Sequence, residues 1–145
     1  FPKFILRLLD NQKCCIHGNG MNKRHFLFVT DTVKALDTVL HNGKLGETYN
    51  IGSNDEVTNI EVAKILIEKM KGKVEAGDHI TYVNDRPFND VRYFLEFQKL
   101  IDLGWKPEVN FDDGIDKTIA WYKSIDPTTY WSIHAINALK AHPEI

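Results

Sequence analysis

The chain has 145 residues, of which 43% are hydrophobic and 26% charged, and its formal net charge is −2. This length predicts a single domain that can bury a core without disulfide or metal support. The near-neutral balance supplies no basic field for nucleic acid or for an anionic membrane. No apolar run reaches the roughly 18 residues of a membrane span, and residues 1–9 are too short and too charged for a secretory signal.

The cysteines and histidines predict a reduced, cytoplasmic protein without a metal centre. Cys14 and Cys15 are neighbours, and adjacent cysteines rarely bridge because the ring they would close is strained. The histidines show no metal-ligand spacing. The chain begins without Met and runs at once into a helical pattern, so we expect that something precedes Phe1 in a longer protein.

The first half of the chain predicts a helix, two strands and a second helix. A helical face covers residues 4–9, and the apolar run 14–16 leads into a turn at 18–20. Short strands are expected at 26–29 and 49–51. Between these strands a helix starts at Thr30 or Asp31 and ends near Gly43. Its expected buried face consists of Val33, Leu36, Val39 and Leu40.

The second half predicts one strand between helices. Residues 58–61 form a capping box, and the helix that follows ends at Gly72. Residues 80–83 form a strand, and residues 97–103 form a short helix. The remaining expectations are a buried stripe of Ile60, Ala63, Ile67 and Met70, a helix from Asp112 or Asp113 that buries Ile115, Ile119 and Tyr122, and a looser helix over residues 130–140.

The pattern as a whole indicates an α/β domain with a small sheet. Most of the polar detail falls in three loops, at residues 13–25, 52–59 and 84–93, and loops on a rigid scaffold often carry binding groups. In the third loop, Arg86 precedes a proline and offers a planar fork of donors that suits a phosphate or diphosphate. The alternative is a surface loop in which Arg86 pairs with Asp85 or Asp90.

The other two loops also allow two readings. In loop 13–25, Arg24 is a candidate for meeting an anion, and the alternative is a tight turn with solvated basic residues. In loop 52–59, Asn59 has an amide that can recognise a base edge, and the alternative is a plain first-turn residue beside its cap. The two glycines at 18 and 20 do not form a Gly-rich dinucleotide loop. No Ser, Cys or Lys nucleophile is placed beside an obvious base.

Several short runs together resemble one family. They are Pro-Lys-Phe at 2–4, Cys-Ile-His-Gly-Asn-Gly at 15–20, Tyr-Asn-Ile-Gly at 49–52, Asp-Arg-Pro-Phe-Asn-Asp at 85–90, Leu-Gly-Trp at 103–105 and Thr-Ile-Ala-Trp-Tyr at 118–122. In order and spacing they resemble the nucleotide-diphosphate-glucose 4,6-dehydratases of the extended short-chain dehydrogenase/reductase superfamily. The resemblance covers nearly the whole chain and implies a small C-terminal nucleotide-sugar-binding portion spanning residues 1–145, with a loosely packed tail at 126–145.

The resemblance also implies what this portion does not carry. In the family, the N-terminal half binds NAD and supplies every catalytic residue, so we expect no catalytic or cofactor-binding residue here and no activity from this chain alone. The substrate is UDP-glucose or dTDP-glucose. Arg-Pro-Phe-Asn-Asp and the run 138–143 favour the UDP-glucose enzymes of rhamnose synthesis, whereas residues 14–18 look more like the animal dTDP-glucose enzymes. Full-length relatives are expected to be homodimers.

Site residues implied by the resemblance lie in four segments. Pro2 and Lys3 match a segment that lines the nucleotide pocket. Cys15, His17 and Asn89 match positions beside the nucleotide. The remaining matches are Arg24 for the phosphate or ribose side, Asn59 in the pocket and Arg86 for the diphosphate. Alternatives are a free-standing nucleotide-sugar-binding module, or a 4-epimerase or UDP-glucuronate decarboxylase relative, and the motif Arg-Pro-Phe-Asn-Asp-x-Arg-Tyr argues against the latter pair.

Overall fold

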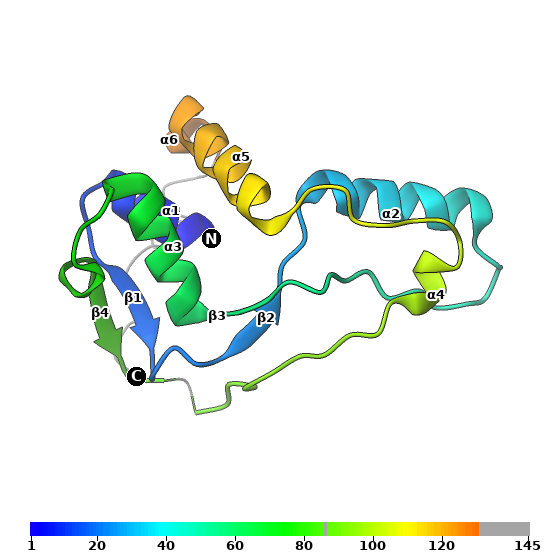
Figure 1. Cartoon of the computed structure of the whole chain (residues 1–145), viewed down its shortest axis with the longest axis horizontal. Helices are drawn as coiled ribbons and strands as arrows, with labels where there is room; N and C mark the ends of the chain where they lie inside the picture. Colours follow the sequence, from blue (N-terminus) through cyan, green and yellow to red (C-terminus); the bar gives the residue numbers. More distant parts are fainter. Residues whose placement is uncertain (86, 131–145) are drawn as a thin grey trace.

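The computed structural model describes residues 1–85 and 87–130, and it places helices around two separate two-stranded sheets (Figure 1). β1 (Cys14–His17) runs parallel to β4 (Ile80–Val83), with Cys14 opposite Ile80. β2 (Lys23–His25) runs antiparallel to β3 (Glu56–Thr58), with Lys23 opposite Thr58. The predicted α/β class is confirmed, as is the strand at residues 80–83.

The main core lies between the β1–β4 sheet and three helices. α1 (Pro2–Leu9) packs against α3 (Asn59–Lys71), α5 (Phe111–Ser124) and β1. Proline suits the start of α1, because a first-turn N–H has no intrahelical partner to lose. Buried members of this core are Ile5, Leu8, Cys14, Ile16, Val62, Ala63, Leu66, Ile67, Ile80, Ile115, Ile119 and Tyr122. The predicted buried face of α5 is therefore confirmed.

α3 starts and ends as its sequence predicts. The Thr58 hydroxyl accepts the backbone N–H of Glu61, and the Glu61 carboxylate accepts the backbone N–H of Thr58, which completes the capping box. Gly72 ends the helix with φ +81°. Within the expected stripe, Ala63 and Ile67 are buried and Ile60 and Met70 half-buried. The stripe omitted Val62 and Leu66, which are also buried because helices and a strand contact α3 from several sides.

α2 (Val29–Asn42) differs most from expectation. It begins at Val29 with Phe28 as N-cap, so the strand predicted at 26–29 is wrong, as is the cap at Thr30 or Asp31. Val33, Leu36 and Leu40 were expected to face inward but are 59%, 57% and 79% exposed. With Val29 they form one apolar stripe along the solvent side, while Asp31 and Ala35 occupy the buried side. Periodicity reveals an apolar face, but it does not reveal what covers that face.

A smaller core joins α2 to α4 (Gln98–Ile101) at the far end of the molecule in Figure 1. Ala35, Leu100 and Trp105 are its buried residues. α4 lies inside the predicted range 97–103, and Gly104 follows with φ +94°. Residues 49–51 form no strand, so that prediction is wrong. Two short elements complete the described part, η1 (Ala76–His79) and α6 (Pro127–Tyr130). The helix predicted at 130–140 lies outside the described residues from position 131 on.

Candidate functional site

The structure brings together the three polar loops that the sequence singled out. Two hydrogen bonds join loop 13–25 to the end of loop 52–59 and the start of α3. The backbone N–H of Asn59 donates to the carbonyl of Asn22 at 3.1 Å, and the backbone N–H of Ile60 donates to the carbonyl of Gly20 at 3.0 Å. Loop 13–25 also meets loop 84–93, since the backbone N–H of Lys23 donates to the carbonyl of Val91 at 2.8 Å. β2 therefore lies between the other two loops and presents its side chains to both.

The turn before β2 requires glycine. Gly20 has φ +73°, and a Cβ added there would lie 2.7 Å from Cγ2 of Ile16 and 3.0 Å from Cβ of Ile60. The backbone N–H of Gly18 donates to the carbonyl of Val83 at 3.0 Å, which ties the turn to the end of β4. Residues 18–20 therefore form the tight turn that the sequence predicted, and β2 with Arg24 follows shortly after this turn.

Arg24 has a guanidinium held by neutral groups. Its Nη1 donates to the carbonyl of Lys23 at 2.6 Å, and its Nη2 donates to the carbonyl of Asp90 at 3.0 Å. The guanidinium carbon lies 4.5 Å from the ring centroid of Tyr93, a cation–π distance. Within residues 1–85 and 87–130, Arg24 forms no ion pair. Its positive charge therefore remains uncompensated in the part of the chain described.

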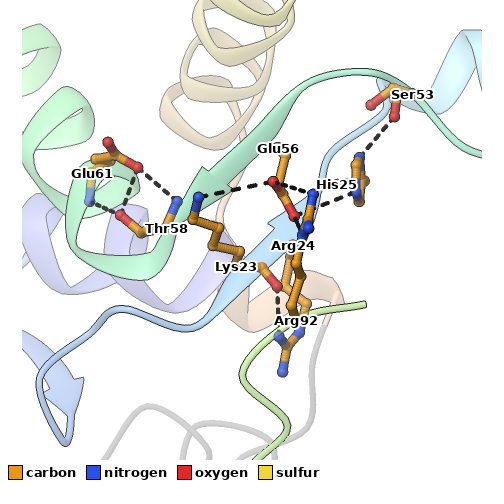
Figure 2. A network of polar contacts seen from close by, with 8 residues as sticks. All are labelled: Lys23, Arg24, His25, Ser53, Glu56, Thr58, Glu61 and Arg92. Carbon is orange, nitrogen blue, oxygen red and sulfur yellow. Dashed lines mark hydrogen bonds and ion pairs between the residues drawn. The ribbon is translucent and has the colours of Figure 1, made fainter. Parts of the chain in front are cut away.

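Glu56 pairs with the basic side chains beside Arg24 (Figure 2). Both of its carboxylate oxygens accept from Arg92, one from Nε and the other from Nη2 at 3.1 Å. Lys23 Nζ lies 3.9 Å and His25 Nε2 lies 3.7 Å from the same carboxylate. The hydrogen bond from Arg92 holds the pKa of Glu56 below its ordinary value. We refer to Lys23, His25, Glu56 and Arg92 as the Glu56 network.

Both strands that carry this network are fixed by neighbours. His25 Nδ1 lies 2.8 Å from the carbonyl of Ser53, and because a carbonyl only accepts, Nδ1 carries the proton and Nε2 faces Glu56. The Ser53 hydroxyl donates to the carbonyl of Phe26 at 2.6 Å. At the other end of β3, the hydrogen bonds from Thr58 lower the pKa of Glu61. Figure 2 shows the contacts from Ser53 through His25 to Glu56, and separately the hydrogen bonds between Thr58 and Glu61.

The structure describes seven of the eight predicted site residues, at differing distances from the network. Asn59 is the first residue of α3 and Asn89 donates to the Asp85 carboxylate at 2.8 Å. His17 ends β1 and is half-buried, whereas Cys15 is buried and pairs with Thr81 of β4. Pro2 and Lys3 start α1 close to the end of β2, since the Phe1 and Phe26 rings pack 4.7 Å apart. Arg86 lies outside the described residues.

The sequence interpretation gave no role to Glu56, Arg92 or Tyr93. Arg92 and Tyr93 stand in the motif that drew attention to loop 84–93, so the run itself was a signal. Glu56 gave no such signal, because acidic residues are common just before a helix N-cap and carry no specific functional meaning there. Its partner Arg92 lies 36 positions further on, and only the fold shows the pair.

A separate apolar pocket of about 660 Å³ lies beside the network. Aromatic rings of Phe1, Phe26, Phe28, Phe111 and Trp121 contribute to its lining, together with Lys117 and Asp55. None of the seven described site residues lines it. This pocket and the cluster of polar groups are thus neighbouring features, and Arg24 belongs to the polar cluster.

Neither a metal site nor a membrane-spanning helix is found in the described ranges. Among residues 1–85 and 87–130 no three His, Cys, Asp or Glu side chains are gathered so that they could hold a metal ion. No helix of those ranges has the length and apolar character needed to cross a membrane.

Comparison with known proteins identifies the class and then the family. In fold, the chain is a small α/β fragment of an extended short-chain dehydrogenase/reductase dehydratase. DesIV, the dTDP-glucose 4,6-dehydratase of Streptomyces venezuelae solved with NAD and TYD bound, superimposes with a TM-score of 0.82 at 32% identity over 97% of this chain. The family model for GDP-mannose 4,6 dehydratase matches residues 1–118. The chain belongs to this family.

Curated relatives carry two substrate names. The chain is 50% identical over 125 residues to dTDP-D-glucose 4,6-dehydratase of Homo sapiens, an alignment that covers 84% of the chain. It is 40% identical over 144 residues to the trifunctional UDP-glucose 4,6-dehydratase/UDP-4-keto-6-deoxy-D-glucose 3,5-epimerase/UDP-4-keto-L-rhamnose-reductase RHM2 of Arabidopsis thaliana, covering 99% of the chain. The matched regions span only 36% and 21% of these relatives, and 41% of DesIV.

Proposed function

We propose that this chain is the C-terminal, nucleotide-sugar-binding portion of a 4,6-dehydratase that acts on UDP-glucose or dTDP-glucose. The observation that carries the proposal is the uncompensated guanidinium of Arg24 at the meeting point of three polar loops. A guanidinium presents several N–H donors in one plane and suits the oxygens of a phosphate. Glu56 pairs with Lys23 and Arg92, whereas Arg24 forms no ion pair among residues 1–85 and 87–130, so its guanidinium is available to meet the ligand.

The remaining roles follow from the family resemblance and support binding rather than chemistry. Arg86 would hold the diphosphate with Arg24, Asn59 would contact the nucleotide, and His17 and Asn89 would lie beside the base and ribose. Cys15 would contribute backbone groups only, since its side chain is buried. NAD and all catalytic residues would belong to the rest of the longer protein. Binding the nucleotide at a distance from the reacting sugar carbons supplies energy for orientation.

Calorimetric titration with UDP and with dTDP tests the proposal. We expect one of them to bind the chain and Arg24→Ala to weaken that binding about tenfold or more, because a charge-assisted contact is lost. Arg86→Ala should weaken it as well. Lys73→Ala is the matched control, because it removes one positive charge at an exposed position after α3 and should change nothing. Equal affinity of the Arg24→Ala variant and the unchanged chain would contradict the proposal.

Activity gives a second test. We expect no conversion of UDP-glucose or dTDP-glucose by the chain, with or without NAD, since the proposal assigns it no catalytic residue. Formation of a 4-keto-6-deoxy sugar by the chain alone would overturn the proposed division of roles.

A further inference from the structure

Arg24 is oriented mainly by a segment distant in sequence. The carbonyl of Asp90 accepts from its Nη2 at 3.0 Å, and the Tyr93 ring lies under its guanidinium at 4.5 Å. The Tyr93 hydroxyl in turn donates to the Asp90 carboxylate, which joins the two contacts into one unit. An arginine side chain has many rotamers, so a platform of this kind decides where the charge of the half-buried Arg24 points.

The segment 90–93 is itself attached to β2 and β3 at few points. The Lys23 N–H donates to the Val91 carbonyl, and the adjoining bridge pairs Lys23 with Arg92. Most residues of the segment are exposed, so little apolar burial fixes it. The two-point contact of Arg92 with Glu56 is the strongest polar attachment among the contacts described. The Glu56 carboxylate is mostly shielded, with 16% of its side chain exposed, which reduces screening of this pair by water.

We propose that Glu56 and Tyr93 are positioning residues of the anion site: Glu56 anchors Arg92 and thereby holds segment 90–93 on the sheet, and Tyr93 directs the Arg24 guanidinium toward the ligand phosphate. The inference rests on the proposed function for the identity of the ligand. It adds that the affinity for phosphate depends on residues that do not touch it, because an arginine already held in place loses less rotamer freedom on binding.

The orientation of Arg24 can be measured without any ligand. An aromatic ring at 4.5 Å shifts the NMR signals of the arginine side chain, so in ¹⁵N,¹³C-labelled protein the Arg24 Nε–Hε and Cδ–Hδ signals report on its stacking. Tyr93→Leu should return them to ordinary arginine values, whereas Tyr93→Phe should largely retain the shift. Glu56→Gln should move them in the same direction as Tyr93→Leu. Lys23→Met is the matched control, because it removes another cation facing Glu56 and leaves the Arg92 contact intact.

A double-mutant cycle separates positioning from a merely structural role. If Glu56 acts through Arg92, the double variant Glu56→Gln/Arg92→Met should weaken UDP or dTDP binding by no more than either single variant, about threefold to tenfold. Losses that multiply would show independent roles and overturn the inference. Circular dichroism should show that all variants are folded at the temperature of the titration, even where the loss of the Glu56–Arg92 contact lowers the thermal midpoint, and Arg92→Lys provides a milder variant if Arg92→Met fails to fold.

The outcomes distinguish this inference from the proposed function. If Arg24 is ring-shifted and responds to Glu56→Gln but neither nucleotide binds, the positioning is supported and the proposed function fails. If a nucleotide binds and Arg24→Ala weakens it, while Glu56→Gln and Tyr93→Leu change neither the Arg24 signals nor the affinity, the positioning is overturned and the proposed function stands.

Discussion

The Asp31 carboxylate on α2 accepts the backbone N–H of Val109 at 2.9 Å, across 78 positions of sequence. The same oxygen accepts the backbone N–H of Glu108 at 3.0 Å, and the Asp31 carbonyl accepts Nε1–H of Trp105. Asp31 is fully buried. An acidic residue expected to cap its own helix instead joins that helix to the segment before α5.

Removing this carboxylate should destabilise the chain strongly. Asp31→Ala leaves two backbone N–H groups without their acceptor, and we expect a loss of about 3 kcal/mol in the free energy of unfolding. Urea denaturation followed by circular dichroism measures this loss. Asp37→Ala on the same helix is the control, with an expected change below about 0.5 kcal/mol, because Asp37 is exposed and its pairing with His41 is weak. Similar losses in both variants would contradict the joining role of Asp31.

Alanine at Gly20 should be costlier than at Gly72, although both glycines have positive φ. A Cβ at Gly72 meets no atom within 4 Å, so Gly72→Ala costs only the strain of its φ +81°, ψ −162° backbone, about 1–3 kcal/mol. A Cβ at Gly20 meets the buried Ile16 and the start of α3, which adds about 1–3 kcal/mol of overpacking. Thermal and urea unfolding of both variants test the difference, and equal stability would show that the turn at 18–20 can relax.

Loss of the capping box should weaken α3. Thr58→Ala removes the acceptor for the Glu61 N–H, and we expect a loss of about 1–2 kcal/mol. Thr48→Ala, at an exposed position outside any helix, should have little effect on unfolding by urea. Hydrogen exchange should also quicken selectively in the first turn of α3. A uniform change over the whole chain would argue against a local cap.

Stability should fall in acid because three glutamates have a pKa below their ordinary value of 4.5. The main causes are hydrogen bonds from Lys99 to Glu47, from Arg92 to Glu56 and from Thr58 to Glu61. For a pKa lowered by folding, the stabilising contribution is complete above the unfolded value and is lost as pH falls through the folded value. The urea midpoint should therefore decrease below about pH 4.5.

The variant Glu56→Gln tests the contribution of one of these groups to acid sensitivity. It should lower stability near neutral pH and make the decrease in acid shallower, because one titrating group with a lowered pKa has been removed. An unchanged slope would mean that the Arg92 contact does not persist in solution.

Local signals of the sequence were reliable where the cause is local. Thr58 and Glu61 satisfy each other within one turn, and the spacing of Ile115, Ile119 and Tyr122 marks a face that does pack. The strand predicted at residues 26–29 was wrong because apolar side chains just before a helix can pack without pairing as a strand. The predicted burial of Val33 and Leu36 was wrong because α2 does have an apolar stripe, but no described part of the chain packs against it.

The sequence identified the three polar loops of the candidate site, but not the contacts between their side chains. The three loops were identified from their polar residues, and hydrogen bonds from Asn59 and Lys23 show that they meet. The contact between Glu56 and Arg92 depends on how β2 and β3 pair and on where loop 84–93 returns. Such long-range geometry is set by tertiary packing, so single-sequence patterns do not contain it.

The burial of both cysteines has a practical consequence for spectroscopy. Cys14 and Cys15 are the only cysteines of the chain and both side chains are shielded from solvent. Burial raises the pKa of Cys14 to about 11, which leaves little thiolate to react at neutral pH. A single cysteine introduced at an exposed position such as Asn54 would then accept a maleimide dye selectively. Fluorescence from a dye beside β3 would report ligand arrival in a protein whose native thiols are left in place.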